Sequence, residues 1–223
     1  SESAMNNTNI TLLDASLIFT KVAENTYGTM RGLRGQGRES DPYIINNAQD
    51  LEFFRASVNS GETKYNAPGV WVALGADIDL EGAEWTEGIG DGHEWSFDGN
   101  FDGKGYTISN LNVKPYKDSG NYVCGGLFGY VYGAVTIRNL TIENVTINAA
   151  DIAGEAHNVG IVAGFAYGNA TFEDITVKGD IKVDAPNAYG VGGIVGYAYY
   201  SYTNISNCHV DANAGSYING YSF

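Results

Sequence analysis

Apolar positions in the C-terminal half of the chain follow a period of two that is interrupted by steps of three. Leu140 and Ile142 alternate with Thr141, which is the periodicity of a strand with one buried face. Ile137 lies three residues before Leu140, and Val145 lies three residues after Ile142, so the chain turns a corner within each step. Short strands joined at such corners predict a polygonal coil rather than a hairpin meander.

This pattern occurs three times, and an internal repeat of this length predicts a solenoid. A glycine-rich segment begins each repeat, with offsets of 35 and then 32 residues, and a second apolar segment follows it. The glycine-rich segments are 125–133, 160–168 and 192–200, and the apolar segments are 137–142, 172–177 and 205–210.

Stacking the repeats in register predicts continuous apolar columns inside the solenoid. Each coil alone cannot cover its apolar face, so its neighbours must cover it. The predicted interior columns are Ile137, Phe172 and Ile205; Leu140, Ile175 and Cys208; and Ile142, Val177 and Val210. Asn139, Asp174 and Asn207 fall at one corner, where polar side chains can bond the backbone of a turn.

The glycine-rich segments resemble the GLUG repeat. Gly126-Leu127-Phe128-Gly129 and Gly193-Ile194-Val195-Gly196 carry the resemblance, and residues 160–164 are a looser copy. Segments further upstream, at 41–51, 77–80, 85–90 and 97–108, also resemble parts of such domains in the same order. The resemblance implies an all-β fold, a right-handed parallel β-helix on an exported bacterial protein, and it implies no established catalytic residues.

We expect three regions along the chain. Residues 1–40 do not fit the repeat and are predicted to be an extension or linker, with a candidate strand from Ile10 to Lys21. Residues 41–115 form the cap and first coils, and residues 116–223 form the three glycine-rich repeats. No cap is recognisable after the last repeat, so we expect the chain to be a fragment of a larger protein.

A short helix is predicted over Asn47–Val58. Leu51, Phe54 and Val58 have helical spacing behind a candidate N-cap at Asn46 or Asn47. Because the first coil of a solenoid otherwise exposes a strand edge, we expect this helix to cover it.

Charge excludes some classes of partner. The chain has 12 basic and 26 acidic residues, a formal net charge of −14. Nucleic acids and anionic membrane surfaces are therefore unsuitable partners. Because no stretch reaches about 18 uninterrupted apolar residues, we expect no membrane insertion. The interpretation is an extracellular or cell-surface protein whose export signal is absent from this sequence.

The two cysteines are not expected to form a disulfide. The register places Cys124 and Cys208 two coils apart, about 10 Å at the usual strand spacing. A disulfide needs Cα atoms within about 7 Å. We interpret both as small buried apolar residues.

The densest acidic run, between Asp77 and Asp102, contains half of a calcium-loop pattern. Asp98, Asn100 and Asp102 match its first ligand positions, but Ser109 stands where the closing Glu should be. The alternative interpretation is a pair of glycine turns between strands. We expect no other cofactor.

An enzymatic function is the alternative to a binding function. Some parallel β-helices are polysaccharide lyases or glycoside hydrolases that use carboxylates of successive coils, and the acidic loop could supply such residues. The repeats contain few carboxylates at matching positions of successive coils, and the alignment identifies no acidic partner for Arg138 or Lys178. His93, His157 and His209 are isolated in sequence and are interpreted as surface residues.

Aromatic residues form the most distinctive candidate site. Tyr130, Phe165 and Tyr197 align in one column, and Tyr132, Tyr167 and Tyr199 align in a second, with Tyr200 and Tyr202 nearby. These rings alternate with Val131, Ala166 and Ala198.

If the small residues face inward, the rings form an exposed ladder that could bind a glycan or a host matrix protein. If the rings face inward, they belong to the core. We expect the first column to be core or half-buried, whereas either position remains open for the second. The ligand candidates are Tyr130, Tyr132, Tyr167, Tyr197 and Tyr199, and the predicted function is a non-enzymatic binding, adhesion or spacer module.

Overall fold

The structure is a computed structural model that describes residues 32–92, 94–115, 124–151, 157–200 and 202–220. The chain divides into two units, Ser1–Arg34 and Gly35–Phe223, and the fold below is that of the second unit. The candidate strand at residues 10–21 lies outside the described residues.

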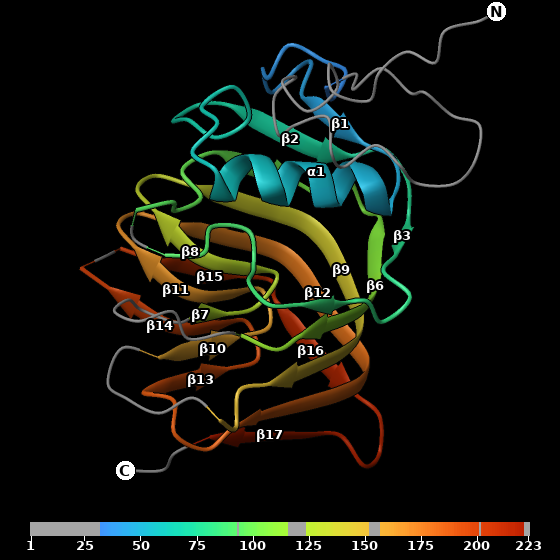
Figure 1. Cartoon of the computed structure of the whole chain (residues 1–223), viewed down its shortest axis with the longest axis vertical. Coiled ribbons are helices and arrows are strands. Elements are labelled where there is room, and N and C mark those ends of the chain that lie inside the picture. The colour runs from blue at the N-terminus through green and yellow to red at the C-terminus, as the bar shows by residue number, and fades with distance from the viewer. Residues whose placement is uncertain (1–31, 93, 116–123, 152–156, 201, 221–223) are drawn as a thin grey trace, which may run out of the picture. The chain divides into compact units, whose positions relative to one another are not determined.

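The described residues form parallel strands and one helix (Figure 1). Most strands are short, as the sequence predicts, but β9 and β12 continue through the predicted corners for 13 and 15 residues. The strands are β1 (Tyr43–Ile45), β2 (Trp71–Leu74), β3 (Ile78–Asp79), β4 (Glu84–Trp85), β5 (Asn100–Asp102), β6 (Thr107–Val113), β7 (Cys124–Gly125), β8 (Phe128–Tyr132), β9 (Thr136–Asn148), β10 (Asn158–Gly160), β11 (Ala163–Tyr167), β12 (Thr171–Ala185), β13 (Gly190–Gly192), β14 (Val195–Tyr199), β15 (Asn204–Ser206), β16 (His209–Ala212) and β17 (Tyr217–Gly220). The helix is α1 (Ala48–Asn59).

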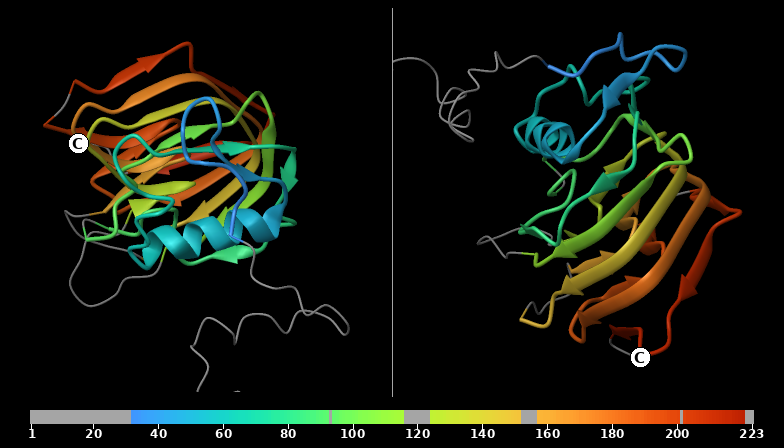
Figure 2. Two further views of the ribbon diagram at one scale, coloured as in Figure 1. Left: turned by 90° about the horizontal axis from the view of Figure 1, so that it is seen from above. Right: turned by 90° about the vertical axis from the view of Figure 1, so that its right-hand side faces the viewer.

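Successive coils stack to give a β-solenoid with three sheets (Figure 2). The largest sheet runs in the order β1-β2-β5-β9-β12-β15, and smaller sheets run β7-β10-β13 and β8-β11-β14. The strands named above all pair in parallel within the described residues, and β12 pairs with β9 on one side and with β15, β16 and β17 on the other. The fold is therefore the parallel β-helix that the repeats predict.

The register confirms two of the predicted interior columns in full. Ile137 lies beside Phe172, which lies beside Ile205, and Ile142, Val177 and Val210 align in the same way. Leu140 pairs with Ile175, as the third predicted column requires. In the two central coils these side chains are 0–1% exposed, so they form the continuous core.

The predicted corners are residues in the left-handed backbone region. Asn139 has φ of 53° and Asn144 has φ of 57°, and Asp174 and Asn207 repeat the first corner at 54° and 51°. Asn and Asp tolerate this region better than other side chains. Two corner side chains bond to the adjacent coil, because Asn139 Nδ2 donates to Asp102 of β5 and Asn207 Nδ2 donates to the corner residue Asp174. Each corner thus bends the chain and ties adjacent coils together.

Helix α1 covers the N-terminal end of the solenoid, as predicted. Asn47 caps it by accepting the Asp50 N–H at 2.9 Å, and the Asp50 carboxylate accepts the Asn46 N–H at 2.9 Å. Leu51, Phe54 and Val58 are 0% exposed, and Phe54 packs against Phe97 and Phe101 of the first coils. The helix lies across that end in Figures 1 and 2. No helix among the described residues is long and apolar enough to span a bilayer.

The opposite end of the solenoid is open in the described part of the chain. Strands β13, β14, β15, β16 and β17 each have a partner strand on one side only. The interior columns continue into this coil but lose their cover, since Ile205, Val210 and Ile218 are 48%, 45% and 43% exposed. The two ends therefore differ: one is covered by a helix, and the other presents strand edges and core side chains.

The glycine motif brings consecutive coils into close contact. A Cβ on Gly160 would collide with the Ala163 carbonyl oxygen and with the Gly196 amide nitrogen of the next coil. The register slips by one residue within the motif, because β7 pairs Gly125 with Val159 whereas β8 pairs Phe128 with Ala163. The ungapped alignment of the first two glycine segments was wrong at this one point.

Candidate functional site

The aromatic residues of the glycine-rich repeats lie on β8, β11 and β14, which form one parallel sheet. Tyr130, Phe165 and Tyr197 are in register, and so are Tyr132, Tyr167 and Tyr199. Val131 and Ala166 between them are 0% exposed. Since successive side chains of a strand point to opposite faces, the small residues face the core and the rings face away from it.

The first aromatic column is nevertheless largely buried. Tyr130 and Phe165 are 3% and 6% exposed and stack at 4.7 Å between ring centroids. With Cys124 they form an apolar cluster of their own, against which Tyr167 and Tyr197 pack. The expectation of a core or half-buried column describes their burial correctly. Tyr130 is consequently too covered to serve as a contact residue for a large ligand.

The second column is exposed, and with Tyr200 we name it the tyrosine ladder: Tyr132, Tyr167, Tyr199 and Tyr200. Tyr132 and Tyr199 are 41% and 45% exposed, and Tyr200 is 77% exposed. Tyr132 and Tyr167 are nearly parallel, with centroids 5.2 Å apart and planes at 8°. Tyr200 is in the left-handed region at φ of 54° and contacts both Tyr167 and Tyr199.

The geometry of the tyrosine ladder limits what it can bind. Two parallel rings at 5.2 Å cannot lie side by side in one plane, so Tyr132 and Tyr167 stack with their faces toward each other. Each of these two rings therefore covers part of one face of the other. Tyr200, at the C-terminal end of the ladder, is mostly exposed. The ladder is therefore a stacked row of phenol rings that ends in an exposed aromatic surface.

Tyr189 belongs to the same aromatic region, and the repeat alignment does not identify it. It is 45% exposed and meets Tyr197 edge to face, with centroids 5.2 Å apart. It precedes β13, where the earlier repeats have no aligned aromatic residue. The periodicity of the repeats therefore could not predict that Tyr189 joins this region.

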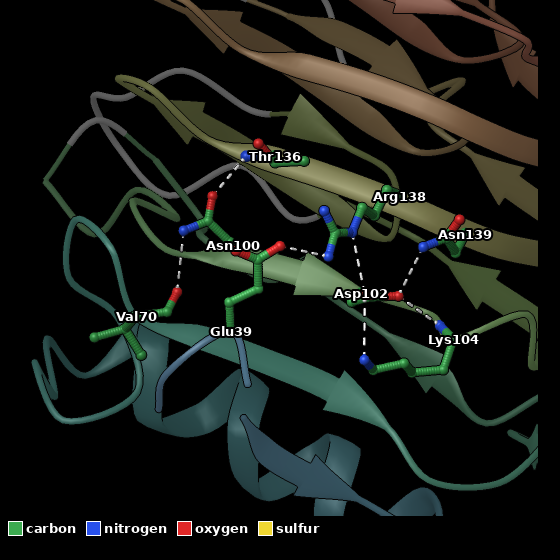
Figure 3. Close-up of polar contacts among 8 residues, drawn as sticks. All are labelled: Glu39, Val70, Asn100, Asp102, Lys104, Thr136, Arg138 and Asn139. Carbon is green, nitrogen blue, oxygen red and sulfur yellow. Dashed lines mark hydrogen bonds and ion pairs between the residues drawn. The ribbon is translucent and has the colours of Figure 1, made fainter. Parts of the chain in front are cut away.

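Of the half calcium-loop pattern, Asn100 and Asp102 lie on β5, and Asp98 precedes it. Protein donors bond to the side-chain oxygen atoms of Asn100 and Asp102 (Figure 3). The Asp102 carboxylate, with a side chain 4% exposed, accepts Arg138 Nε at 3.0 Å, Asn139 Nδ2 at 3.1 Å and the Lys104 N–H at 2.8 Å. Burial alone would raise the pKa of Asp102, but these hydrogen bonds and the nearby Lys104 charge hold it below its usual value. The carboxylate is thus ionised and neutralised within the protein.

The side chains of Asn100 and Asp98 also form hydrogen bonds within the protein. Asn100 Oδ1 accepts the Thr136 N–H of the next coil at 2.9 Å, and its Nδ2 donates to the Val70 carbonyl at 3.3 Å. Asp98 Oδ1 accepts the Ser96 hydroxyl at 2.8 Å. A calcium ion bound by all three residues would have to displace these donors. Among the described residues, no group of three or more His, Cys, Asp or Glu side chains is placed to hold a metal ion.

Arg138 and Lys178 both have acidic partners in register, contrary to the sequence interpretation. Arg138 aligns with Asp102, donates to Glu39 at 2.8 Å, and lies 4.4 Å from the centre of the Trp71 ring. Lys178 aligns with Glu143, with 3.7 Å between Nζ and Oε2. The alignment of the three repeats missed Asp102 because that residue belongs to an earlier coil.

The histidines do not share one environment. His209 is exposed, as expected, and aligns with Thr176. His157 is only 4% exposed, so its interpretation as a surface residue was wrong. It adjoins β10, and its carbonyl accepts the Tyr189 N–H of the next coil, which places it against the following repeat. His93 lies outside the described residues.

Both cysteines are free thiols, as expected. Cys124 is buried, and burial raises the pKa of its thiol to about 12, which keeps it protonated and unreactive. Cys208 is only half-buried, because it lies in the open last coil. The expectation of burial therefore holds for Cys124 and was wrong for Cys208.

Asp91 has the most perturbed carboxyl group of the acidic loop. Burial raises its pKa to about 6, and the negative charges of Glu87 and then Glu94 add to the effect. Neither an ion pair nor a hydrogen bond to a cationic side chain compensates it among the described contacts. The carboxylate is therefore less favourable in the folded protein than in the unfolded chain.

The chain is a β-solenoid whose glycine-rich repeats are similar to the GLUG motif. Residues 187–214 match the family described as the GLUG motif, and this stretch contains the third repeat with β13, β14 and β15.

Two curated proteins are similar to the chain over longer stretches. One is halomucin from Haloquadratum walsbyi, 33% identical over 172 residues, which cover 73% of this chain and 2% of halomucin. The other is a protein of Evansella cellulosilytica provisionally named a Gly-rich membrane protein, 31% identical over 139 residues, which cover 60% of this chain and 14% of that protein. The chain thus spans a small part of each relative.

A crystal structure from Bacteroides ovatus, of a protein provisionally named an immunoglobulin A1 protease, is also similar. Sequence identity is 17%, the alignment covers 84% of this chain and 79% of that one, and the TM-score is 0.37. A superposition this loose carries no information about function.

Proposed function

We propose that this β-solenoid is a non-enzymatic recognition module of an extracellular or cell-surface protein, and that its tyrosine ladder binds a glycan. The observation that carries the proposal is the exposure of Tyr132, Tyr199 and Tyr200 on a sheet whose other face is core. A cluster of exposed aromatic side chains on one face is typical of binding sites in soluble proteins.

The chemistry of the ladder suits a polyhydroxylated chain. Phenol groups both donate and accept hydrogen bonds, and the largely exposed Tyr200 ring adds an apolar surface for a sugar ring. The parallel strands repeat these groups from coil to coil, so an extended polymer could contact several coils at once. The net charge of −14 favours neutral or cationic glycans over acidic ones.

The test is binding of the purified chain to a glycan array and to a panel of matrix proteins, followed by calorimetry on any ligand found. Tyr132→Ala and Tyr199→Ala should each weaken glycan binding by about threefold to tenfold, which is the usual contribution of one aromatic contact. Tyr106→Ala is the matched control, because Tyr106 is 37% exposed but lies before β6, away from the aromatic sheet.

Three results would overturn the proposal. Binding confined to a matrix protein would replace the glycan with a protein partner. Absence of any ligand would favour a spacer that only holds other parts of the protein apart. Turnover of a polysaccharide that is abolished by Asp98→Ala or Asp102→Ala would make the protein an enzyme.

A further inference from the structure

We propose that Tyr132 and Tyr167 form an oxidative cross-linking site, at which one-electron oxidation joins the two phenol rings and ties two successive coils covalently. The proposal rests on the geometry of these two rings and does not depend on glycan binding by the tyrosine ladder.

The sheet holds the two rings together. Tyr132 on β8 pairs with Tyr167 on β11, and adjacent strands of a sheet lie about 4.8 Å apart. The ring centroids are 5.2 Å apart, and the ring planes are 8° from parallel. The backbone pairing therefore keeps one phenol ring facing the other, so the two rings can react without a search by the side chains.

An oxidant can reach this pair from solvent. Tyr132 is 41% exposed, and Tyr167 is half-buried beside it. A phenol needs only to approach an oxidant closely enough to lose an electron and its hydroxyl proton, so partial exposure is sufficient.

The neighbouring aromatic column provides a comparison within the same sheet. Tyr130 stacks on Phe165, with centroids 4.7 Å apart and planes at 17°. Phe165, however, has no hydroxyl group from which a phenoxyl radical could form, and it separates Tyr130 from Tyr197 in the column. Tyr130 and Phe165 are also only 3% and 6% exposed. The first column therefore has the stacking without the chemistry, whereas the second column has both.

The other ring contacts of the tyrosine ladder are less suitable for coupling. Tyr167 lies 6.0 Å from Tyr199 with planes at 48°, and 6.1 Å from Tyr200. Tyr199 and Tyr200 meet edge to face, with planes at 74°. Within the described part of the ladder, Tyr132 and Tyr167 are thus the most nearly parallel pair, and we expect the cross-link to form there.

The reaction needs an oxidant, which hydrogen peroxide and a peroxidase supply. Each phenol loses one electron and its hydroxyl proton to give a phenoxyl radical, whose unpaired electron lies partly on the Cε atoms beside the oxygen. The two radicals pair their electrons in a new Cε–Cε bond. The hydrogens on those two carbons leave as protons while the two oxygens take up protons, which restores both phenols. Hydrogen peroxide accepts the two electrons and two protons and becomes two molecules of water.

Proximity favours a cross-link within one chain over a cross-link between chains. Groups that are held in place react as if their local concentration were very high. The net charge of −14 also makes two copies of the chain repel each other at low salt. At low protein concentration and low salt, the bond should therefore form inside the monomer.

The experiment is treatment of the full 223-residue chain with a peroxidase and hydrogen peroxide under these conditions, then isolation of the monomer and tryptic mass spectrometry. Trypsin cuts after Lys117, Arg138 and Lys178, so Tyr167 is the only tyrosine of its peptide. We expect peptides 118–138 and 139–178 to be joined with the loss of two hydrogen atoms. The monomer should also gain dityrosine fluorescence.

Conservative variants identify the rings that react. Tyr132→Phe and Tyr167→Phe keep an aromatic ring but remove the hydroxyl group, and each should abolish the joined peptides. Tyr106→Phe is the matched control, because Tyr106 is 37% exposed but lies before β6, and it should leave their yield unchanged. Peptide 118–138 also contains Tyr122 and Tyr130, so the Tyr132→Phe variant decides which ring forms the bond.

Circular dichroism establishes that each variant is folded. Oxidation that joins only separate chains, or that modifies tyrosines without joining the two peptides, would overturn the proposal. Joined peptides that persist in a folded Tyr132→Phe variant would overturn it as well. A chain that binds no glycan but yields the joined peptides would refute the proposed glycan binding while supporting the cross-linking site.

Discussion

Replacing Asp102 tests whether the polar contacts in Figure 3 hold the first coils together. In Asp102→Asn the side chain keeps its shape, and Oδ1 can still accept the Lys104 N–H and Asn139 Nδ2. The new amide group, however, would point a donor at Arg138 Nε, which is itself a donor at 3.0 Å. The variant therefore loses the ion pair and gains a repulsive contact.

The expected loss follows from the burial of the carboxylate. A hydrogen bond to a charged group contributes about 1.5–3 kcal/mol, and breaking a buried ion pair costs about 3–5 kcal/mol. Arg138 is 24% exposed and keeps its contact with Glu39, so part of its charge remains compensated. We expect Asp102→Asn to lower the free energy of unfolding by about 2–4 kcal/mol near neutral pH.

The assay is urea unfolding followed by circular dichroism, with Arg138→Met and the double variant to complete a thermodynamic cycle. The coupling free energy between the two residues should be about 2 kcal/mol. Because the pKa of Asp102 is lowered in the folded state, its contribution is present above the unfolded-state pKa and is lost as the pH falls through the folded pKa. The difference between Asp and Asn should therefore shrink in acid. A loss below about 0.5 kcal/mol, or no coupling, would refute the reasoning.

Three further predictions concern the core, the acidic loop and metal binding. Ile137→Ala should lower the free energy of unfolding by about 2–5 kcal/mol, whereas Ile205→Ala, in the same column but half-exposed, should lower it by about 1 kcal/mol or less. Equal losses in thermal or urea unfolding would contradict the exposure of Ile205. Asp91→Asn should stabilise the protein by about 1 kcal/mol near neutral pH, after allowance for solvent screening, because the raised pKa shows that the folded state disfavours the charged carboxylate. The gain in unfolding free energy should vanish as the pH falls from about 6 toward the unfolded-state pKa, and Glu84→Gln, at an exposed position that does not affect Asp91, is the control. Addition of calcium should not shift the melting temperature, because the side-chain oxygen atoms of Asn100 and Asp102 already accept hydrogen bonds from protein donors. A calcium-dependent shift that is abolished by Asp98→Ala would instead show a metal site.

Periodicity along the chain predicts much of this fold. The steps of two and three identify the inward residues and the corners, and the left-handed φ values of Asn139 and Asn144 lie at the predicted positions. The capping helix follows from Leu51, Phe54 and Val58, because an apolar face at helical spacing has to be covered. These features depend on residues that are close together in the chain, so a single sequence is enough to predict them.

Burial on the outer face could not be predicted in the same way. Alternation places Tyr130 and Tyr132 on the same side of β8, yet one is 3% and the other 41% exposed. The difference depends on which side chains pack beside each ring, such as Cys124 beside Tyr130. The burial of His157 and the pairing of Arg138 with Asp102 also depend on neighbouring coils, and the three-repeat alignment did not extend to the coil of Asp102.

Stacking of the coils also has a mechanical consequence. Hydrogen bonds between coils run along the solenoid axis, because each strand pairs with the aligned strand of the adjacent coil. Tension applied to a coil at one end of a stack would therefore load the hydrogen bonds to its neighbour first and peel that coil away before the next. One coil contains 32 residues, since Val195 pairs with Ala163 of the preceding coil. Each peeled coil would release roughly 110 Å of extended chain. A protein built this way could lengthen in discrete increments under force while the remaining coils stay folded.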